Sequence, residues 1–366
     1  MTVVLWIVLV MAALYMLQWA VFRIVGLKSV SYDRSFSASR VHAGESLWMR
    51  ETIANRARLP RPWVRVESLL PAQIVFKHAQ ADMSIHSGDR LQNHASLFSI
   101  PGNTEIVRKH EIVCPSRGKY RIDSYTLTSG DFVGFSGRSV RQPADLEIVV
   151  YPKVRPISDL PLEARKYVQS IRSMASPIRE DAPFVSGIRP YRPGDPFRMV
   201  NWSATAKTGQ MLVHRREAMQ DNDLTVIVNA ELLDHANNVR ISAETFEEAL
   251  SYAASVAQYM IGGGGRTGLI FNGATDESDT SVFRVSEKSG AAHMDAMLEA
   301  MAGFKPVTKL GLSFLLKQLI DEKRRGKHYL LLSGFIGEKE SQFVRQLREQ
   351  GNAVELLLLG KGEVAS

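Results

Sequence analysis

Residues 187–213 read G-I-R-P-Y-R-P-G-D-P-F-R-M-V-N-W-S-A-T-A-K-T-G-Q-M-L-V, and they separate two differently patterned parts of the chain. The first half of this stretch is rich in proline, which favours an extended loop. Asp195 then takes the position of a helix N-cap, and Pro196 the first helical position, where a missing N–H costs nothing. Gly209 suits the left-handed position that ends a helix. The stretch therefore predicts a short helix over 196–208.

This predicted helix is apolar on two stripes, formed by Phe197, Val200 and Ala204 and by Met199, Trp202 and Ala206. A short helix that is apolar on most sides is a buried helix. Charged side chains accompany it, namely Arg189, Arg192, Asp195 and Arg198. Arg198 lies four residues before Trp202, so its guanidinium can stack on the indole.

Two interpretations of these charges remain open. Buried charges are usually paired internally, which favours an Arg–Asp network that clamps two domains together. The alternative is an anion site at the start of the helix.

The stretch resembles the signature of a bacterial family called domain of unknown function 58. The family pattern is Gly-x-Arg-x-Tyr-x-x-Gly-Asp-x-x-Arg-x-x-x-Trp-x-x-x-Ala, followed by a domain like the von Willebrand factor A domain. The matching positions are Gly187, Arg189, Tyr191, Gly194, Asp195, Arg198, Trp202 and Ala206. The resemblance implies membrane-associated proteins, often encoded beside an AAA+ ATPase of the MoxR type, with no established catalytic activity.

The composition is that of a globular protein with a moderate positive charge. The chain has 366 residues, which is enough for two domains with their own cores, and its formal net charge is +7. The basic residues are scattered rather than striped, and no nucleic-acid motif is present. We therefore expect no nucleic-acid partner and favour an anionic membrane surface. A disulfide framework is impossible, because Cys114 is the single cysteine.

The N-terminal residues 1–27 predict a transmembrane anchor. Residues 3–22 are apolar except for Gln18. A helix of this length can span the hydrocarbon core of a membrane. A cleaved signal peptide is the alternative, but the segment lacks a basic start, is long for such a peptide and has no A-x-A-like site after it. Basic residues follow the span and none precedes it, the first four being Arg23, Lys28, Arg34 and Arg40. We expect a single-pass protein of the bacterial inner membrane, with its N-terminus outside and its soluble body in the cytoplasm.

Residues 28–155 predict a β-sandwich-like domain. Short alternating runs recur between turn-rich segments. These runs are Ser46–Ile53, Trp63–Leu69, Glu105–Val113, Tyr120–Leu127 and Leu146–Val150. We find no metal-ligand cluster and no nucleophile with a base in this region, so we expect a packing and recognition module.

Residues 156–218 hold a linker helix, predicted at Asp159–Ser173, and the signature segment. Residues 219–366 alternate between strands and helices, which predicts an α/β domain with a mostly parallel sheet covered on both faces. Strands are predicted at 224–229, 267–271, 282–285, 329–332 and 354–359, and helices at 243–260, 292–301, 310–323 and 341–350. This pattern fits the von Willebrand factor A-like fold that the resemblance implies.

Such domains can hold a divalent cation through an Asp-x-Ser-x-Ser run after the first strand, completed by a threonine and a further aspartate. Here the run reads Asn229-Ala230-Glu231-Leu232-Leu233, so the aspartate and both serines are absent. We expect no metal and no other cofactor, because hard cations prefer charged oxygen ligands. The weak candidates for such a site are Asn229, Glu231, Thr308 and Ser333.

No Ser–His–Asp set, His pair or Cys–His pair stands out, so we expect no enzyme. The sequence predicts a membrane-anchored, non-catalytic interaction or scaffold protein. Its cytoplasmic body would partner a MoxR-type AAA+ ATPase in complex assembly or maturation. The alternative is an anion-binding receptor or enzyme that uses the Arg/Asp cluster of residues 187–213.

Overall fold

The computed structural model describes residues 2–25, 27–78, 83–130, 137–175, 185–192, 197, 200–216, 223–231, 233–234, 239–240, 242–275, 282–359 and 363–364. The chain divides into two compact units, Met1–Lys153 and Val154–Ser366.

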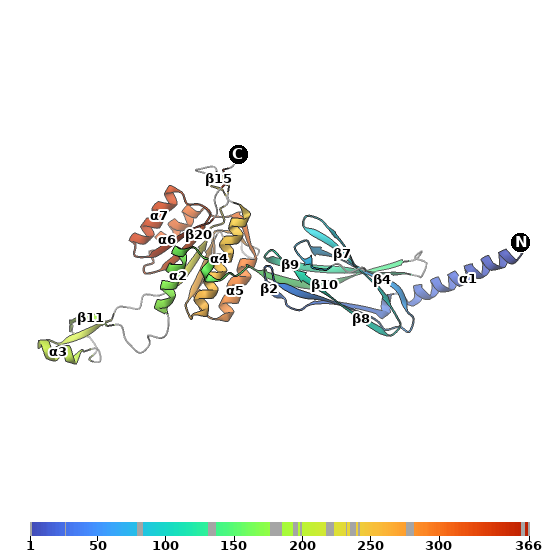
Figure 1. Cartoon of the computed structure of the whole chain (residues 1–366), viewed down its shortest axis with the longest axis horizontal. Helices are drawn as coiled ribbons and strands as arrows, with labels where there is room; N and C mark the ends of the chain where they lie inside the picture. Colours follow the sequence, from blue (N-terminus) through green and yellow to red (C-terminus); the bar gives the residue numbers. More distant parts are fainter. Residues whose placement is uncertain are drawn as a thin grey trace. The chain divides into compact units, whose positions relative to one another are not determined.

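The first unit begins with helix α1, Thr2–Val25 (Figure 1). Within it, Val3–Ala20 is long and apolar enough to cross a membrane, and none of this stretch is buried in the protein. A signal sequence at the same place satisfies the same criterion. The structure therefore bears out an N-terminal apolar helix.

Two sheets follow in the first unit, and both are built from alternating strands. One has the order β1-β3-β8-β5, with β1 Val30–Phe36, β3 Ser46–Asn55, β8 Thr104–Val113 and β5 Val75–Phe76. The other has the order β2-β10-β9-β4-β7-β6, with β2 Arg40–His42, β10 Gly137–Tyr151, β9 Gly118–Gly130, β4 Arg61–Pro71, β7 Leu91–Ile100 and β6 Met83–Ser87. Neighbours are antiparallel except β10 and β2, which are parallel.

The two sheets pack face to face. Successive side chains of a strand point to opposite faces, so each sheet has one apolar face that it can bury against the other sheet. One core cluster joins Ile53 of β3 to Val66 of β4 and Phe98 of β7. A second joins Met49 of β3 to Ile148 of β10. Each of the five strands predicted from the sequence lies within a longer strand of this sandwich.

Strand β8 forms part of an edge of its sheet. β5 pairs only with Val113 and Ile112 at one end of β8. Among the described residues, the remainder of β8 has a paired strand on one side only, which is β3.

The second unit contains a five-stranded sheet with the order β18-β16-β13-β20-β21. The strands β16, β13, β20 and β21 are mutually parallel, and the edge strand β18 is antiparallel to β16. Their bounds are β13 Leu224–Val228, β16 Thr267–Phe271, β18 Phe283–Lys288, β20 His328–Ser333 and β21 Ala353–Leu358. Every residue of β13 is buried, as expected for a strand covered on both faces.

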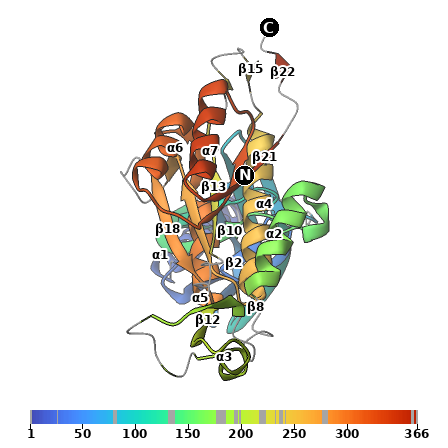
Figure 2. The same ribbon diagram turned by 90° about the vertical axis from the view of Figure 1, so that its left-hand side faces the viewer.

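Helices cover both faces of this sheet (Figure 2). The helices are α2 Leu162–Ala175, α4 Ala243–Gly262, α5 Ala291–Ala302, α6 Leu312–Asp321 and α7 Glu338–Glu349. On one face, Leu315 of α6 and Leu347 of α7 share a core cluster with Ile227 of β13. On the other, Phe246 of α4 lies 5.9 Å from Phe271 of β16, measured between ring centroids.

Shorter elements complete the second unit. β17 Gly273–Thr275 pairs with β19 Phe304–Thr308, and a small sheet joins β14 Leu233–Asp234, β15 Val239–Arg240 and β22 Glu363–Val364. The signature segment contains β11 Val185–Pro190, α3 Trp202–Thr208 and β12 Leu212–Arg216. The described residues also include the 3₁₀ turns η1 Leu27–Ser29 and η2 Ile157–Asp159.

Candidate functional site

The carboxyl ends of the parallel strands meet at one edge of the sheet, and three polar side chains are buried there. Asn229 follows β13, Asn272 follows β16 and Ser333 ends β20. All three are nearly inaccessible to solvent. This edge is where open α/β sheets place their binding sites, so its chemistry decides what the unit can bind.

Hydrogen bonds connect these three side chains to one another. Nδ2 of Asn229 donates to Oγ of Ser333 at 2.9 Å, and Nδ2 of Asn272 donates to Oδ1 of Asn229 at 2.8 Å. Oδ1 of Asn272 accepts from the backbone N–H of Ala230 at 2.7 Å, and its Nδ2 also donates to the carbonyl of Leu310 at 2.9 Å. The network is neutral and ties the loop after β13 to the loop before α6.

The weak metal candidates are only partly brought together here. Asn229 and Ser333 are in direct contact, but Oδ1 of Asn229 already accepts bonds from Asn272 and from the backbone N–H of Glu231. Thr308 lies at the end of β19, where its backbone pairs with Gly273. Neutral amide and hydroxyl groups are poor ligands for a hard cation, so the expectation of no metal stays a prediction with this donor set in its favour.

A carboxylate and an aromatic ring lie beside the network. Oε1 of Glu231 accepts from the backbone N–H of Leu312, the first residue of α6, at 3.2 Å. A Cβ placed on Gly311 would lie 3.2 Å from that oxygen and 3.7 Å from Cδ2 of Phe314, so the carboxylate and the ring flank the same glycine. The Phe314 side chain is 66% exposed. An exposed ring of this kind is suited to contact with a partner.

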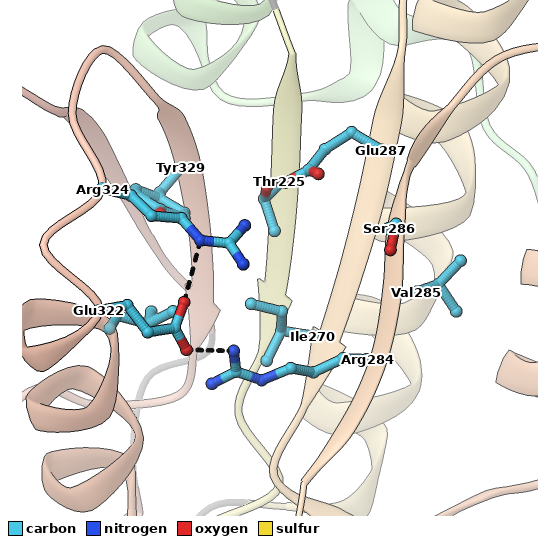
Figure 3. Close-up of a pocket in the computed structure, with 10 residues that line it drawn as sticks. Thr225, Ile270, Arg284, Val285, Ser286, Glu287, Glu322, Arg324 and Tyr329 are labelled. Carbon is cyan, nitrogen blue, oxygen red and sulfur yellow. Dashed lines mark hydrogen bonds and ion pairs between the residues drawn. The ribbon is translucent and has the colours of Figure 1, made fainter.

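A polar pocket lies beside the amino ends of β13 and β20, lined also by β18 and α6 (Figure 3). Its volume is about 70 Å³, far below the roughly 300–1,000 Å³ of small-molecule sites. Glu322 forms ion pairs with Arg284 and, at 3.1 Å, with Nε of Arg324. Since these charges compensate one another, the pocket is a structural ion-pair network.

One further carboxylate lines this pocket. Oγ1 of Thr225 donates to Oε1 of Glu287 at 2.6 Å. Burial by itself raises the pKa of Glu287, but the Thr225 hydroxyl and nearby cations outweigh it and hold that pKa below its ordinary value. Glu287 is thus stabilised in its charged form.

The signature segment forms a small hairpin. β11 pairs antiparallel with β12, and α3 lies between them in the sequence. Asn201 caps α3, since its side chain accepts from the backbone N–H of Ala204 at 2.9 Å. The predicted end at Gly209 is confirmed, because this residue has the left-handed φ of 69°. The prediction of one continuous helix was wrong: Val200 forms a β-bridge with Val213, so α3 begins only at Trp202. Asp195 and Pro196, the predicted start, lie outside the described residues.

The prediction of a buried helix was also wrong. No residue of α3 is buried, and Trp202 and Phe197 are 63% and 64% exposed. Among the side chains of this segment that the structure describes, the buried apolar ones are Val200 and Val213, which the β-bridge brings together. An apolar stripe marks an apolar surface, and here that surface faces solvent.

The signature residues are therefore spread along the hairpin. Gly187 and Arg189 lie on β11, Tyr191 follows it, and Trp202 and Ala206 lie on α3. Arg192 is exposed. Gly194, Asp195 and Arg198 lie outside the described residues, as does any stacking of Arg198 on Trp202. The domain clamp and the anion site consequently both stay predictions.

The structure also reveals a buried polar cluster in the sandwich that sequence reasoning missed. Glu51 of β3 is fully buried and accepts four hydrogen bonds. Its donors are the hydroxyl of Tyr32 at 2.5 Å, Nη2 of Arg34 at 2.9 Å, Oγ of Ser96 at 2.9 Å and Nε2 of His110 at 2.9 Å. A second histidine, His94, places Nδ1 3.4 Å from Nη2 of Arg34.

Burial and neighbouring side chains shift the pKa values of the ionisable groups in this cluster. Burial raises the pKa of Glu51, but the hydrogen bond from His110 and the charge of Arg34 outweigh it and hold that pKa well below its ordinary value. Burial, reinforced by Arg34, lowers the pKa of His94 to about 4, so His94 is neutral. Ligand atoms of Glu51, His94 and His110 lie within 4.8 Å of one another, a spacing that a metal ion could use. The Arg34 guanidinium and the four bonds to Glu51 occupy that position, however, so the cluster is an ion-pair core.

A signal for this cluster was present in the sequence. In the predicted strand Ser46–Ile53, Glu51 has the same parity as Leu47, Met49 and Ile53, all of which face inward. Strand parity alone therefore places a carboxylate inside the sandwich, where it needs a cation.

Comparisons with known proteins agree with the signature. Residues 187–361 match the family described as "Protein of unknown function DUF58". The match begins at the first glycine of the signature and extends beyond β21. It supports assignment to the DUF58 family, and it leaves the sandwich and α1 outside the DUF58 match.

Curated relatives support the same family. The uncharacterized protein YeaD of Bacillus subtilis is 23% identical over 278 residues, which cover 75% of this chain and 63% of YeaD. The uncharacterized protein Mb1516 of Mycobacterium bovis is 30% identical over 155 residues, which cover 41% of this chain and 46% of that protein. The chain thus spans less than two thirds of the length of these relatives. Among solved structures, the CARDB domain of the PF1109 protein from Pyrococcus furiosus is 13% identical and has a TM-score of 0.22. The match covers 33% of this chain and 91% of that domain, and a score this low does not establish a shared fold.

Proposed function

We propose that the chain is a membrane-anchored interaction protein that binds a protein partner and catalyses no reaction. The docking surface is the carboxyl edge of the parallel sheet in the DUF58 region. The observation that carries this proposal is the exposed ring of Phe314 beside the Glu231 carboxylate, above a polar network that is already hydrogen-bonded.

The chemistry of this edge favours docking over bond-making. Asn229, Asn272 and Ser333 satisfy one another, so none of them is poised as a base or an activated nucleophile. An exposed aromatic ring is the type of side chain that dominates binding energy at protein interfaces. The carboxylate beside it favours a partner whose surface carries apolar and basic groups.

The fold is consistent with a von Willebrand factor A-like assignment of the second unit. Four parallel strands with helices on both faces support this assignment, and the antiparallel strand β18 is an addition at one edge. The partner that follows from the family resemblance is a MoxR-type AAA+ ATPase, acting with this protein in complex assembly or maturation.

The anchor in this proposal is α1, retained in the mature protein. Its apolar stretch supports a single pass through the bacterial inner membrane. Basic residues follow the stretch, which supports a cytoplasmic body and an external N-terminus.

Capture of the ATPase by the full-length protein in detergent tests the proposal. The wild-type protein retains the MoxR-type ATPase encoded by the same organism, and Phe314→Ala weakens capture about tenfold or more, as for a central interface residue. Gln318→Ala, a matched change at an exposed position one turn further along α6, leaves capture unchanged. Equal capture of the ATPase by wild type and Phe314→Ala would contradict a docking site at Phe314. If the protein converts a substrate, and Asp195→Asn abolishes this turnover without loss of folding, the protein is an enzyme and the proposal is wrong.

A further inference from the structure

The signature hairpin is strongly positive for its length. Residues 185–216 contain six Lys or Arg residues and one Asp, a formal net charge of +5, whereas the whole chain carries +7. The six cations are Arg189, Arg192, Arg198, Lys207, Arg215 and Arg216. The residues that follow the hairpin, 217–366, contain 15 Lys or Arg and 21 Asp or Glu residues, a formal net charge of −6, so the hairpin is a positive segment before an acidic domain.

The same hairpin exposes several large apolar side chains. The ring of Phe197 stacks on that of Tyr191, with centroids 6.0 Å apart and an interplanar angle of 28°. The backbone N–H of Tyr191 donates to the carbonyl of Met211 at 2.9 Å, which places Met211 next to this pair. Phe197 and Met211 are 64% and 38% exposed.

Trp202 is another exposed apolar residue of the hairpin. The backbone N–H of Asn201 donates to the carbonyl of Leu212 at 2.8 Å, so Trp202 begins α3 close to Met211. Its side chain is 63% exposed. We call the four side chains Tyr191, Phe197, Trp202 and Met211 the aromatic tip.

Internal packing does not account for the aromatic tip. Of the hairpin side chains that the structure describes, Val200 and Val213 form the small core, at 5% and 1% exposed. Large apolar side chains that remain in water next to a cationic segment mark a binding surface.

We propose that the aromatic tip inserts into the headgroup region of an anionic membrane, with the exposed cation of Lys207 at the lipid phosphates. Tryptophan and other aromatic rings are favoured at the membrane–water interface, and each basic residue near an anionic bilayer adds to the attraction. The chain itself argues for a membrane as the occupant, because α1 is long and apolar enough to cross one. A nucleic acid also attracts cations and aromatic rings, but no nucleic-acid motif accompanies the hairpin.

A fluorophore at the hairpin tests the proposal in full-length protein reconstituted into vesicles. Gln210 is exposed and adjoins Met211, so Gln210→Cys carries an environment-sensitive label. The native Cys114 is fully buried, and burial raises the pKa of its thiol to about 11, so it stays unlabelled. Spin-labelled lipids then report whether the label reaches the bilayer, independently of how α1 is held.

We expect quenching in vesicles that contain phosphatidylglycerol, and little in vesicles of phosphatidylcholine alone. Trp202→Ala reduces the quenching, and Lys207→Gln weakens hairpin binding about fivefold, the effect of one basic residue near the surface. Lys317→Gln, which removes an exposed cation of α6, serves as the matched control and changes nothing.

Three results would overturn the proposal. They are absence of quenching in both vesicle types, equal quenching in both, and a fluorescence response to an oligonucleotide that lipid does not reproduce. The lipid contact and the protein docking site are separable, since Trp202→Ala leaves ATPase capture intact and Phe314→Ala leaves lipid quenching intact.

Discussion

Nη2 of Arg34 lies 2.9 Å from Oε1 of Glu51 inside the sandwich, where the two side chains are 2% and 0% exposed. A buried ion pair needs further hydrogen bonds to offset the loss of water, and both partners have them. Arg34 also donates to the hydroxyls of Tyr32 and Ser68, at 2.9 and 2.7 Å. The cluster connects strands of both sheets and so contributes to their register.

Replacing one partner of this ion pair should strongly destabilise the first unit. We expect Arg34→Met to lower the free energy of opening by about 3–5 kcal/mol, because Glu51 is left charged and buried. Native-state hydrogen exchange of β3 and β8 amides measures this locally. Arg65→Met is the control: its pair with Glu67 is 50% and 30% exposed, so the change should stay below about 1 kcal/mol. Equal protection in the two variants would contradict a stabilising role for the cluster.

Lowering the pH should reduce the free energy of opening of the first unit. In the folded state the pKa of His94 is about 4, below the 6.5 of an unperturbed histidine. A depressed pKa means that His94 contributes stability that is complete above pH 6.5 and is lost as pH falls toward 4. The lowered pKa of Glu51 acts in the same direction, below the ordinary range of a carboxyl group.

The slope of stability against pH checks this prediction. Between pH 6.5 and 4 the unfolded state binds up to one more proton at His94, which corresponds to at most about 1.4 kcal/mol per pH unit. Exchange of β7 amides measured across this range should show that loss, and His94→Phe should flatten it. A slope that His94→Phe leaves unaltered would assign the acid sensitivity to other groups.

Magnesium should not bind at the carboxyl edge of the sheet. Oδ1 of Asn229 already accepts two hydrogen bonds, the amide and hydroxyl oxygens of the network are neutral, and the Glu231 carboxylate beside them accepts from the backbone N–H of Leu312. Calorimetric titration of the wild-type protein with Mg²⁺ or Mn²⁺ should show no heat beyond dilution. Saturable heat that Asn229→Leu removes would instead place a cation at this edge.

The amide of Asn272 should stabilise the second unit through the loops it connects. We expect Asn272→Ala to cost about 1–3 kcal/mol, since the backbone N–H of Ala230 and the carbonyl of Leu310 lose a buried partner. Hydrogen exchange at β13 and α6 measures the effect. Asn201→Ala is a useful comparison: it removes the cap of the exposed helix α3 and should affect the hairpin alone.

Periodicity predicted the regular elements of the second unit well. β16 has the predicted bounds, and α4 extends only two residues beyond its predicted end at 260. A long helix with a continuous apolar face and a buried five-residue strand have unambiguous patterns, because tertiary packing and local preference agree there.

Strand β7 escaped prediction for a physical reason. Its inward positions include Gln92, His94 and Ser96, all buried, while Leu91 and Leu97 on its other face are about half exposed. The polar cluster inverts the usual apolar-in pattern, so hydrophobic alternation cannot find the strand. The sequence of α3 has a related limit. Its apolar stripe predicts an apolar face on the helix, but it does not predict whether that face is buried or exposed.

The incomplete pairing of β8 has a consequence for behaviour at high protein concentration. An unpaired strand edge is a template on which a second chain can extend the sheet. Glu105 and Lys109 are exposed on this strand, and charged side chains at an edge discourage such growth. Resistance to self-association therefore depends here on two surface charges that contribute nothing to the interior.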